Sequence, residues 1–105
     1  MLKWRTSIII YKNLSVQNGL SQNTVNAILQ DKQGFMWFGT KDGLNRYDGL
    51  SFRKFKHDDR TRRSIGNNFI TALYEDAKGN IWVGTDVGLY IYNPEKDSFP
   101  AFLLN

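Results

Sequence analysis

The chain repeats itself with a period of 45 residues, and this repeat restricts the fold more than any other feature of the sequence. A shift of 45 positions aligns residues 23–48 with residues 68–93 without a gap, and ten of the 26 aligned pairs are identical. Chance gives about one or two identities over such a length. A repeat of this length is typical of propeller blades that contain four strands each. The identical pairs are Asn23/Asn68, Ala27/Ala72, Asp31/Asp76, Gly34/Gly79, Trp37/Trp82, Gly39/Gly84, Thr40/Thr85, Gly43/Gly88, Leu44/Leu89 and Tyr47/Tyr92.

Turn residues divide each repeat into four short strands. In the first repeat we expect strands at residues 24–30, 35–40, 44–47 and 51–56, separated by turns that contain Gly34, Gly43 and the Asp48-Gly49 pair. Glycine adopts positive φ without strain, and Asp-Gly is a strong hairpin signal. The second repeat copies this plan as far as Phe102, with a longer last hairpin at residues 93–97.

The second strand of each repeat is apolar on both of its faces. Residues 35–38 read Phe-Met-Trp-Phe and residues 81–83 read Ile-Trp-Val, whereas a half-exposed strand alternates apolar and polar residues. Both faces must therefore be covered. In a propeller, the two neighbouring blades cover the faces of each blade. We expect Trp37 and Trp82 to pack between blades rather than to stack on a sugar. Gly39 and Gly84 are expected to allow close approach of a neighbouring blade rather than to bind an anion.

These patterns predict an all-β chain: a β-propeller fragment with two tandem four-stranded antiparallel blades plus an N-terminal orphan outer strand. Residues 1–22 are assigned to that strand and to the loop that follows it, residues 23–57 to blade 1, and residues 58–105 to a connecting loop and blade 2. The orphan strand runs from Ile8 to Leu14 and would pair with the last blade of a closed ring, because closure removes exposed sheet edges.

Composition excludes several classes of protein. The chain has no cysteine, so it cannot contain a disulfide or a thiolate metal site. The apolar run near the start is shorter than a signal-peptide core, and no stretch approaches the roughly 20 apolar residues that cross a bilayer. No signal peptide and no membrane contact are therefore expected. The net charge of +4 comes mostly from residues 53–63, which we interpret as a solvated outer strand and loop rather than a nucleic-acid site.

Catalytic chemistry has few candidate residues in this sequence. Asp31, Asp42, Asp48 and Asp76 all lie in turn signals, where aspartate most often accepts hydrogen bonds from nearby backbone N–H groups. His57 is the only histidine, so a zinc site of the usual kind lacks ligands. A serine triad could be built only around this one residue. We expect no catalytic residues, no metal site and no cofactor.

Several segments together resemble a known family. They are residues 19–25 (Gly-Leu-Ser-Gln-Asn-Thr-Val), 28–31, 34–40 (Gly-Phe-Met-Trp-Phe-Gly-Thr) and 42–49, followed by 75–76, 79–85, 88–89 and 92–93. This pattern is similar to the two-component-regulator propeller repeat of bacterial hybrid histidine kinases. The resemblance implies a periplasmic sensor region with many blades, which responds to polysaccharide breakdown products, and a kinase that lies elsewhere in the parent protein.

Three functions remain open from the sequence. The first is a fragment of a periplasmic sensor propeller that recognises a glycan-derived ligand or transmits its binding. The alternatives are a fragment of a propeller lyase-like enzyme and a protein-interaction scaffold without a small ligand. A ligand site would use the loops at one mouth of the propeller, and its candidate residues are Gln22, Asn23, Lys41, Asp42, Asn67, Asn68 and Asp86.

The expected partners are an oligosaccharide ligand of the parent sensor and neighbouring blades or copies of the chain itself. Two blades cannot close a ring, so apolar blade faces would be left exposed to water. We therefore predict a homo-oligomer, a trimer or tetramer formed by head-to-tail contact between blade 2 of one copy and blade 1 of the next.

Overall fold

The computed structural model describes residues 24–103, which form two antiparallel sheets. The orphan strand expected at Ile8–Leu14 lies outside these residues, as do Gln22 and Asn23. Within the described part, the structure contains no helix long and apolar enough to span a membrane. The first sheet, blade 1, consists of β1 (Val25–Gln30), β2 (Met36–Thr40), β3 (Gly43–Tyr47) and β4 (Phe52–Phe55); the second, blade 2, consists of β5 (Ile70–Glu75), β6 (Ile81–Thr85) and β7 (Leu89–Tyr92).

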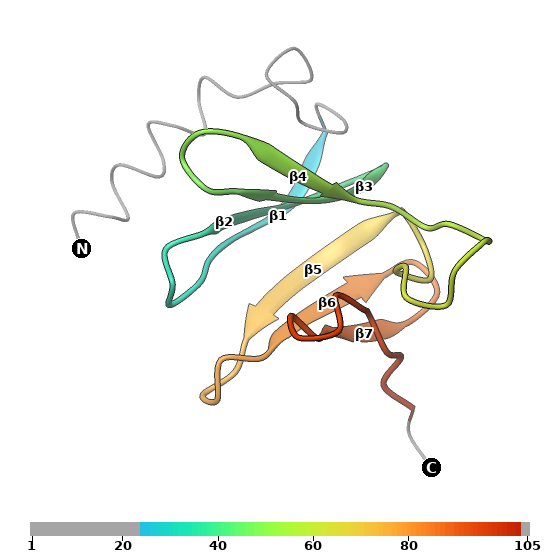
Figure 1. The fold of residues 1–105 in the computed structure, drawn as a ribbon. Coiled ribbons are helices and arrows are strands. Elements are labelled where there is room, and N and C mark those ends of the chain that lie inside the picture. The colour runs from blue at the N-terminus through green and yellow to red at the C-terminus, as the bar shows by residue number, and fades with distance from the viewer. Residues whose placement is uncertain (1–23, 104–105) are drawn as a thin grey trace.

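The strands follow each other in sequence order in both sheets, as a four-stranded propeller blade requires (Figure 1). The register also repeats. Trp37 lies opposite Leu29 on β1, and Trp82 lies opposite Tyr74 on β5. Both first strands contain an irregularity at the same repeat position, between Val25 and Ala27 and again at the equivalent residues of β5. The two sheets are therefore one structural unit repeated, and the all-β propeller prediction is confirmed.

The fourth strand of blade 2 is reduced to two isolated bridges. Tyr90 pairs with Ala101 and Asn93 pairs with Ser98 in one common register, so a continuous strand is almost formed. Pro100 interrupts it: its carbonyl accepts a hydrogen bond from Ile91 N at 3.0 Å, but proline has no N–H to return the bond. The repeat predicts a complete fourth strand here, and Pro100 accounts for the difference.

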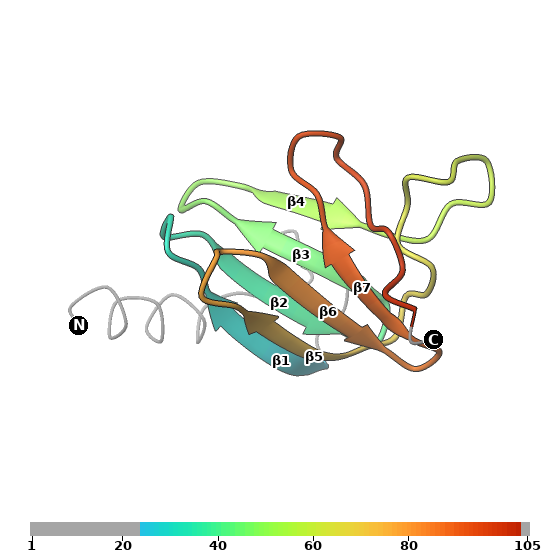
Figure 2. The ribbon, with the colours of Figure 1, turned by 90° about the horizontal axis from the view of Figure 1, so that it is seen from below.

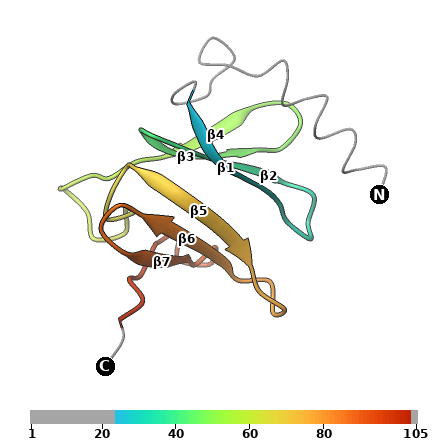
Figure 3. The ribbon, with the colours of Figure 1, turned by 180° about the vertical axis from the view of Figure 1, so that it is seen from behind.

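The two blades pack face to face through their first two strands. β5 lies alongside β1 and β2, as Figures 2 and 3 show from two sides. Asn26 strengthens the contact by donating from Nδ2 to the carbonyl of Ile70 across 2.9 Å. The shared core contains buried side chains from both blades and from the segments that follow β4 and β7: Trp37, Leu44, Phe55, Ile65, Ile70, Ile81, Val83, Tyr92 and Phe99.

Gly39 lies at a point where the two blades approach each other closely. A Cβ atom built on Gly39 would lie 2.4 Å from Cγ2 and 3.0 Å from Cβ of Ile70 on the facing blade. Gly84, at the same position in blade 2, would meet only Thr71 and Ala72 of its own blade, at 3.3 Å or more. The expected role of glycine at this position, close approach of a neighbouring blade, is therefore confirmed for Gly39.

Blade 2 exposes the face that corresponds to the packed face of blade 1. Tyr74 on this open face is 64% exposed, and Leu89 and Phe102 are also exposed. Trp82 is half-buried and makes an edge contact with Phe102, with ring centroids 5.1 Å apart. Trp37, its counterpart, is buried between the blades as predicted, whereas Trp82 lies where a third blade would pack.

Candidate functional site

The loop end of the blades carries the site residues expected from the sequence. The β2–β3 turn contains Lys41 and Asp42, and the β4–β5 loop contains Asn67 and Asn68. The two segments meet here, because Gly43 N donates to the carbonyl of Asn68 across 2.7 Å. Asp86 occupies the same end of blade 2, in the β6–β7 turn.

Three of these polar side chains support local structure. The Asn68 side-chain oxygen accepts a hydrogen bond from His57 N at 2.6 Å, and Asn67 accepts one from Phe69 N at 2.9 Å. Asp42 forms an ion pair with Lys56, with Nζ and Oδ2 2.8 Å apart. Lys41 and Asp86 are exposed, so they are the side chains at this end that a ligand can reach most readily.

The β4–β5 loop holds His57 between two acceptors. Ring atom Nδ1 lies 2.9 Å from the carbonyl of Ile65, and Nε2 lies 2.6 Å from Oδ1 of Asp59. Only the protonated imidazolium can donate to both, so these contacts, the Ile65 carbonyl first, raise the pKa of His57 above its usual value of 6.5. Beside it, hydrogen bonds from Arg60 lower the pKa of Asp58 to about 2.

Titration of His57 tests this arrangement. Because the folded-state pKa is raised, protonated His57 contributes stability that is fully present below the unfolded pKa near 6.5 and is lost as pH rises through the folded pKa. We expect NMR titration of the single histidine to give a pKa above 6.5 in the folded chain and a lower value in Asp59→Asn. A folded-state pKa at or below 6.5 would contradict the described loop geometry.

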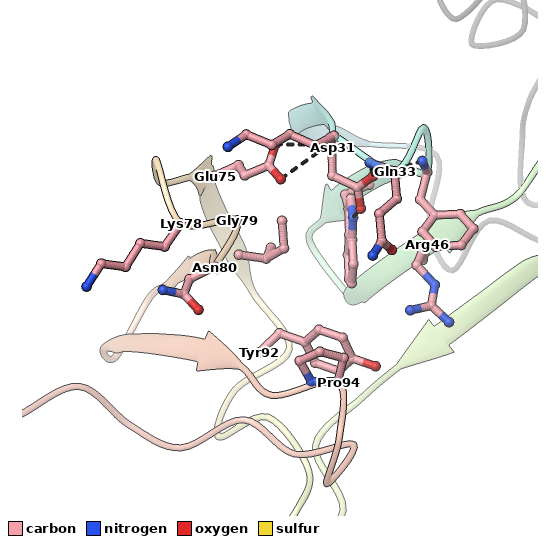
Figure 4. Close-up of a pocket in the computed structure, with 13 residues that line it drawn as sticks. Asp31, Gln33, Arg46, Glu75, Lys78, Gly79, Asn80, Tyr92 and Pro94 are labelled. Carbon is pink, nitrogen blue, oxygen red and sulfur yellow. Dashed lines mark hydrogen bonds between the residues drawn. The ribbon is translucent and has the colours of Figure 1, made fainter.

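The opposite end of the blades contains a cleft of about 390 Å³ (Figure 4). It lies between the β1–β2 turn of blade 1 and the β5–β6 turn of blade 2. Lys32 closes one side of it by joining the blades: its backbone N donates to the Glu75 carboxylate at 3.1 Å, and its Nζ donates to the Ala77 carbonyl at 2.9 Å. The lining comes from both blades and consists of Asp31, Lys32, Gln33, Phe35, Trp37 and Arg46 from blade 1, and Glu75, Lys78, Gly79, Asn80, Ile81, Tyr92 and Pro94 from blade 2.

Asp31 and Asp76 shape the turns at this end in the same way. Oδ1 of Asp31 accepts hydrogen bonds from the backbone N atoms of Gln33 and Phe35, and Oδ2 accepts one from Trp37 Nε1 at 2.8 Å. Asp76 repeats the pattern with its own turn and with Trp82 Nε1 at 2.9 Å. Donation from Trp82, followed by that from Asn80, holds the pKa of Asp76 well below its usual range.

The structural role expected for the turn aspartates is therefore confirmed for Asp31 and Asp76, and also for Asp48, which accepts hydrogen bonds from the backbone N atoms of Leu50 and Ser51. Asp42 differs because its side chain pairs with Lys56. Across residues 24–103, no three histidine, aspartate or glutamate side chains gather into a metal-binding group.

Arg46 is the cleft residue that the sequence analysis missed. Its guanidinium carbon lies 4.9 Å from the ring centre of Phe35 and 5.5 Å from that of Trp37. The repeat itself contains a signal for it: the equivalent position in blade 2 is Ile91, so Arg46 places a cation where the other repeat has an apolar residue.

Sheet order, register and blade packing define the chain as two neighbouring β-propeller blades. Comparison with known proteins shows what the two repeats are similar to. The profile described as "Two component regulator propeller" matches residues 19–42 and 64–87, which are the equivalent parts of the two repeats. These two segments are therefore similar to the two-component regulator propeller repeat.

The similar proteins include a histidine kinase and the extracellular domains of a hybrid two component system and a one component system. Histidine kinase P4 of Formosa agariphila is 42% identical over 64 residues, which are 61% of this chain and 5% of that kinase. The extracellular domain of a hybrid two component system from B. thetaiotaomicron is 38% identical and superposes with a TM-score of 0.76, over 89% of this chain and 13% of that domain. The extracellular domain of a one component system from the same organism shares the fold, with a TM-score of 0.71 at 24% identity over 85% of this chain and 13% of that domain. The chain thus spans a small part of each relative.

Proposed function

We propose that the chain contributes two blades to a sensor propeller that acts outside the cytoplasm, in the periplasm, as part of a hybrid two-component signalling protein. The observation that supports this most is the 38% identity to the extracellular domain of a hybrid two component system, because it extends over 89% of the chain. In this proposal the blades are a binding and transmitting element, and any phosphotransfer takes place in a separate kinase region.

The ligand of this sensor is proposed to be a glycan-derived oligosaccharide, bound at the loop end. Lys41 and Asp86 are exposed there, on equivalent turns of the two blades, and can form hydrogen bonds with sugar hydroxyl groups. Asn67 and Asn68 hold the intervening loop in place through their side-chain hydrogen bonds. A ligand that crosses from one blade to the next would contact both turns at once.

Calorimetric titration with a panel of neutral and acidic oligosaccharides tests this proposal. We expect at least one member to bind and expect the Lys41→Ala/Asp86→Ala double variant to lose that binding. Lys96→Ala, which changes an exposed lysine at the opposite end outside the cleft lining, serves as the control and should bind normally. Absence of binding across the panel, or equal binding by the double variant, would overturn the proposed ligand site.

Assembly is a separate part of the proposal. The open face of blade 2 exposes Tyr74, Leu89 and Phe102, and it is the counterpart of the face that blade 1 buries. We propose that a second copy of the chain covers it. Light scattering should show concentration-dependent association, whereas a stable monomer of 12.2 kDa at micromolar concentration would contradict it. On blade 1, Met36 and Phe38 of the other face are already buried, so association should depend on blade 2 residues such as Trp82.

A further inference from the structure

Two arginines face each other across β3 and β4, and only one of them has an acidic partner. Arg46 and Arg53 are direct neighbours in the register of the two strands. Like charges at directly opposed positions of a sheet destabilise it. Arg53 is neutralised by an ion pair with Asp97, whose other oxygen accepts a hydrogen bond from Tyr92. Within residues 24–103, Arg46 forms no ion pair, and the Asp48 carboxylate acts on it only through a longer-range Coulombic attraction, so no carboxylate uses the Arg46 N–H groups.

Aromatic rings hold the Arg46 guanidinium at the edge of the cleft. Its central carbon lies 4.9 Å from the ring centre of Phe35, 5.5 Å from that of Trp37 and 5.8 Å from that of Phe55. Stacking on ring faces orders the side chain, and none of the N–H groups, which lie in the guanidinium plane, donates to a carboxylate of residues 24–103. A guanidinium that is held in place and has unused donors is well suited to a planar, two-oxygen anion.

The other charges of the cleft do not satisfy Arg46. The Asp31 carboxylate accepts its hydrogen bonds from its own turn and from Trp37, and the Glu75 carboxylate accepts from Lys32 N. Lys32 and Lys78 add two positive charges to the same lining. The cleft therefore contains three cationic side chains and two carboxylates that already accept hydrogen bonds. Its net positive charge favours the binding of an anion.

The remaining lining residues offer contacts for a ring. In Figure 4, Gln33 and Arg46 reach from blade 1 towards Tyr92 and Pro94 of blade 2, and Asn80 lies on the far side of the same space. Pro94 is exposed and presents a flat apolar surface, whereas Tyr92 lines the cleft but is only 6% exposed. The amides of Gln33 and Asn80 can donate and accept hydrogen bonds. A volume of about 390 Å³ is within the range of small-ligand pockets, which is about 300–1,000 Å³.

We propose that this cleft is a second binding site, which takes a carboxylate carried on a single ring. The carboxylate pairs side-on with the Arg46 guanidinium, which forms no ion pair within residues 24–103. The ring lies against Pro94, beside the small exposed part of Tyr92. Because the cleft and the loop end are at opposite ends of the strands, this site does not depend on the oligosaccharide site proposed above.

Three small probes define the ligand chemistry. Glucuronate and glucose have closely related rings and differ in the carboxylate, while benzoate carries the carboxylate on an aromatic ring. NMR titration of the chain should show saturable shifts in the cleft residues with glucuronate or benzoate, with a Kd of about 1 mM, and none with glucose. Preference between the two acids identifies the ring as that of a sugar acid or an aromatic acid. Binding of glucose equal to that of glucuronate, or no binding of either acid, would overturn the proposal.

Arg46→Gln tests the role of the guanidinium. Loss of a charge-assisted contact should weaken acid binding by at least about tenfold, and Arg46→Lys should restore part of it. Arg62→Gln removes the same charge from an exposed loop position and should leave binding unchanged. The melting temperature of Arg46→Gln shows that the variant is folded. Equal affinity in Arg46→Gln and the original chain would contradict the site, whereas the Lys41→Ala/Asp86→Ala variant should bind these acids normally.

Discussion

Replacing Gly39 with alanine is expected to destabilise the chain by about 1 to 3 kcal/mol, although the change adds a single methyl group. The new Cβ would lie 2.4 Å from Cγ2 of Ile70, which is far inside van der Waals contact. Ile70 cannot move away easily, because it is fully buried between the blades and its own Cβ would lie only 3.0 Å from the new atom. The blades must separate locally, or β2 must shift within its sheet.

Gly84→Ala is the matched control for this prediction. The position is equivalent in the repeat, but the added Cβ would meet only Thr71 and Ala72, at 3.3 and 3.4 Å. The expected change in stability is within about 0.5 kcal/mol, since alanine also loses less backbone entropy than glycine on folding. Urea denaturation of both variants compares the two free energies of unfolding. Equal costs would mean that Gly39 is required by its own strand and that blade packing is not the cause.

The fold was predictable from this sequence because the same information occurs twice. Gly34 and Gly79 both adopt positive φ, of 96° and 88°, so each supports the turn assignment of the other. Asp31 and Asp76 likewise accept the same set of hydrogen bonds in their two turns. A single copy of such a turn would have been a weak signal, but two copies at a constant spacing indicate a blade.

Identity between equivalent residues of the two repeats did not show whether both residues are buried. Trp37 and Trp82 occupy the same repeat position, yet one is buried and the other half-buried, because only blade 1 has a neighbour on that side. The burial of a side chain in a stacked fold depends on the position of its blade within the stack. The sequence of one blade does not specify that position. The shortened last strand has a local cause in Pro100, which the period alone could not show.

The candidate sites were predictable to different extents. The sequence indicated which loops share one end of the blades, and Lys41, Asp42, Asn67 and Asn68 do lie together there. It did not indicate that Asn68 is engaged by His57 N, since that contact spans a loop of irregular structure. The cleft at the other end depends on the distance between two blades, and Arg46 becomes a candidate only once the charges around it are known.

Trp37→Ala should be the most destabilising single change, at about 3 to 5 kcal/mol. The indole is 1% exposed and packs against Phe55 and Tyr92, with ring centroids 5.9 and 5.4 Å away. Its removal leaves a cavity between the blades and takes from Asp31 the hydrogen bond that Nε1 donates. Both losses act on the contact that joins blade 1 to blade 2, so we expect a lower midpoint of unfolding for the whole chain.

Trp82→Ala serves as the comparison, because Trp82 donates the equivalent hydrogen bond to Asp76 but lies on the open face of blade 2. Water already reaches part of this ring, so the expected cost is about 1 to 2 kcal/mol. Thermal and urea unfolding of both variants at several protein concentrations tests the difference. A cost for Trp82→Ala that rises with concentration towards that of Trp37→Ala would show that a second copy buries the ring, because stability then includes the association energy. Equal costs at every concentration would contradict the described exposure of Trp82.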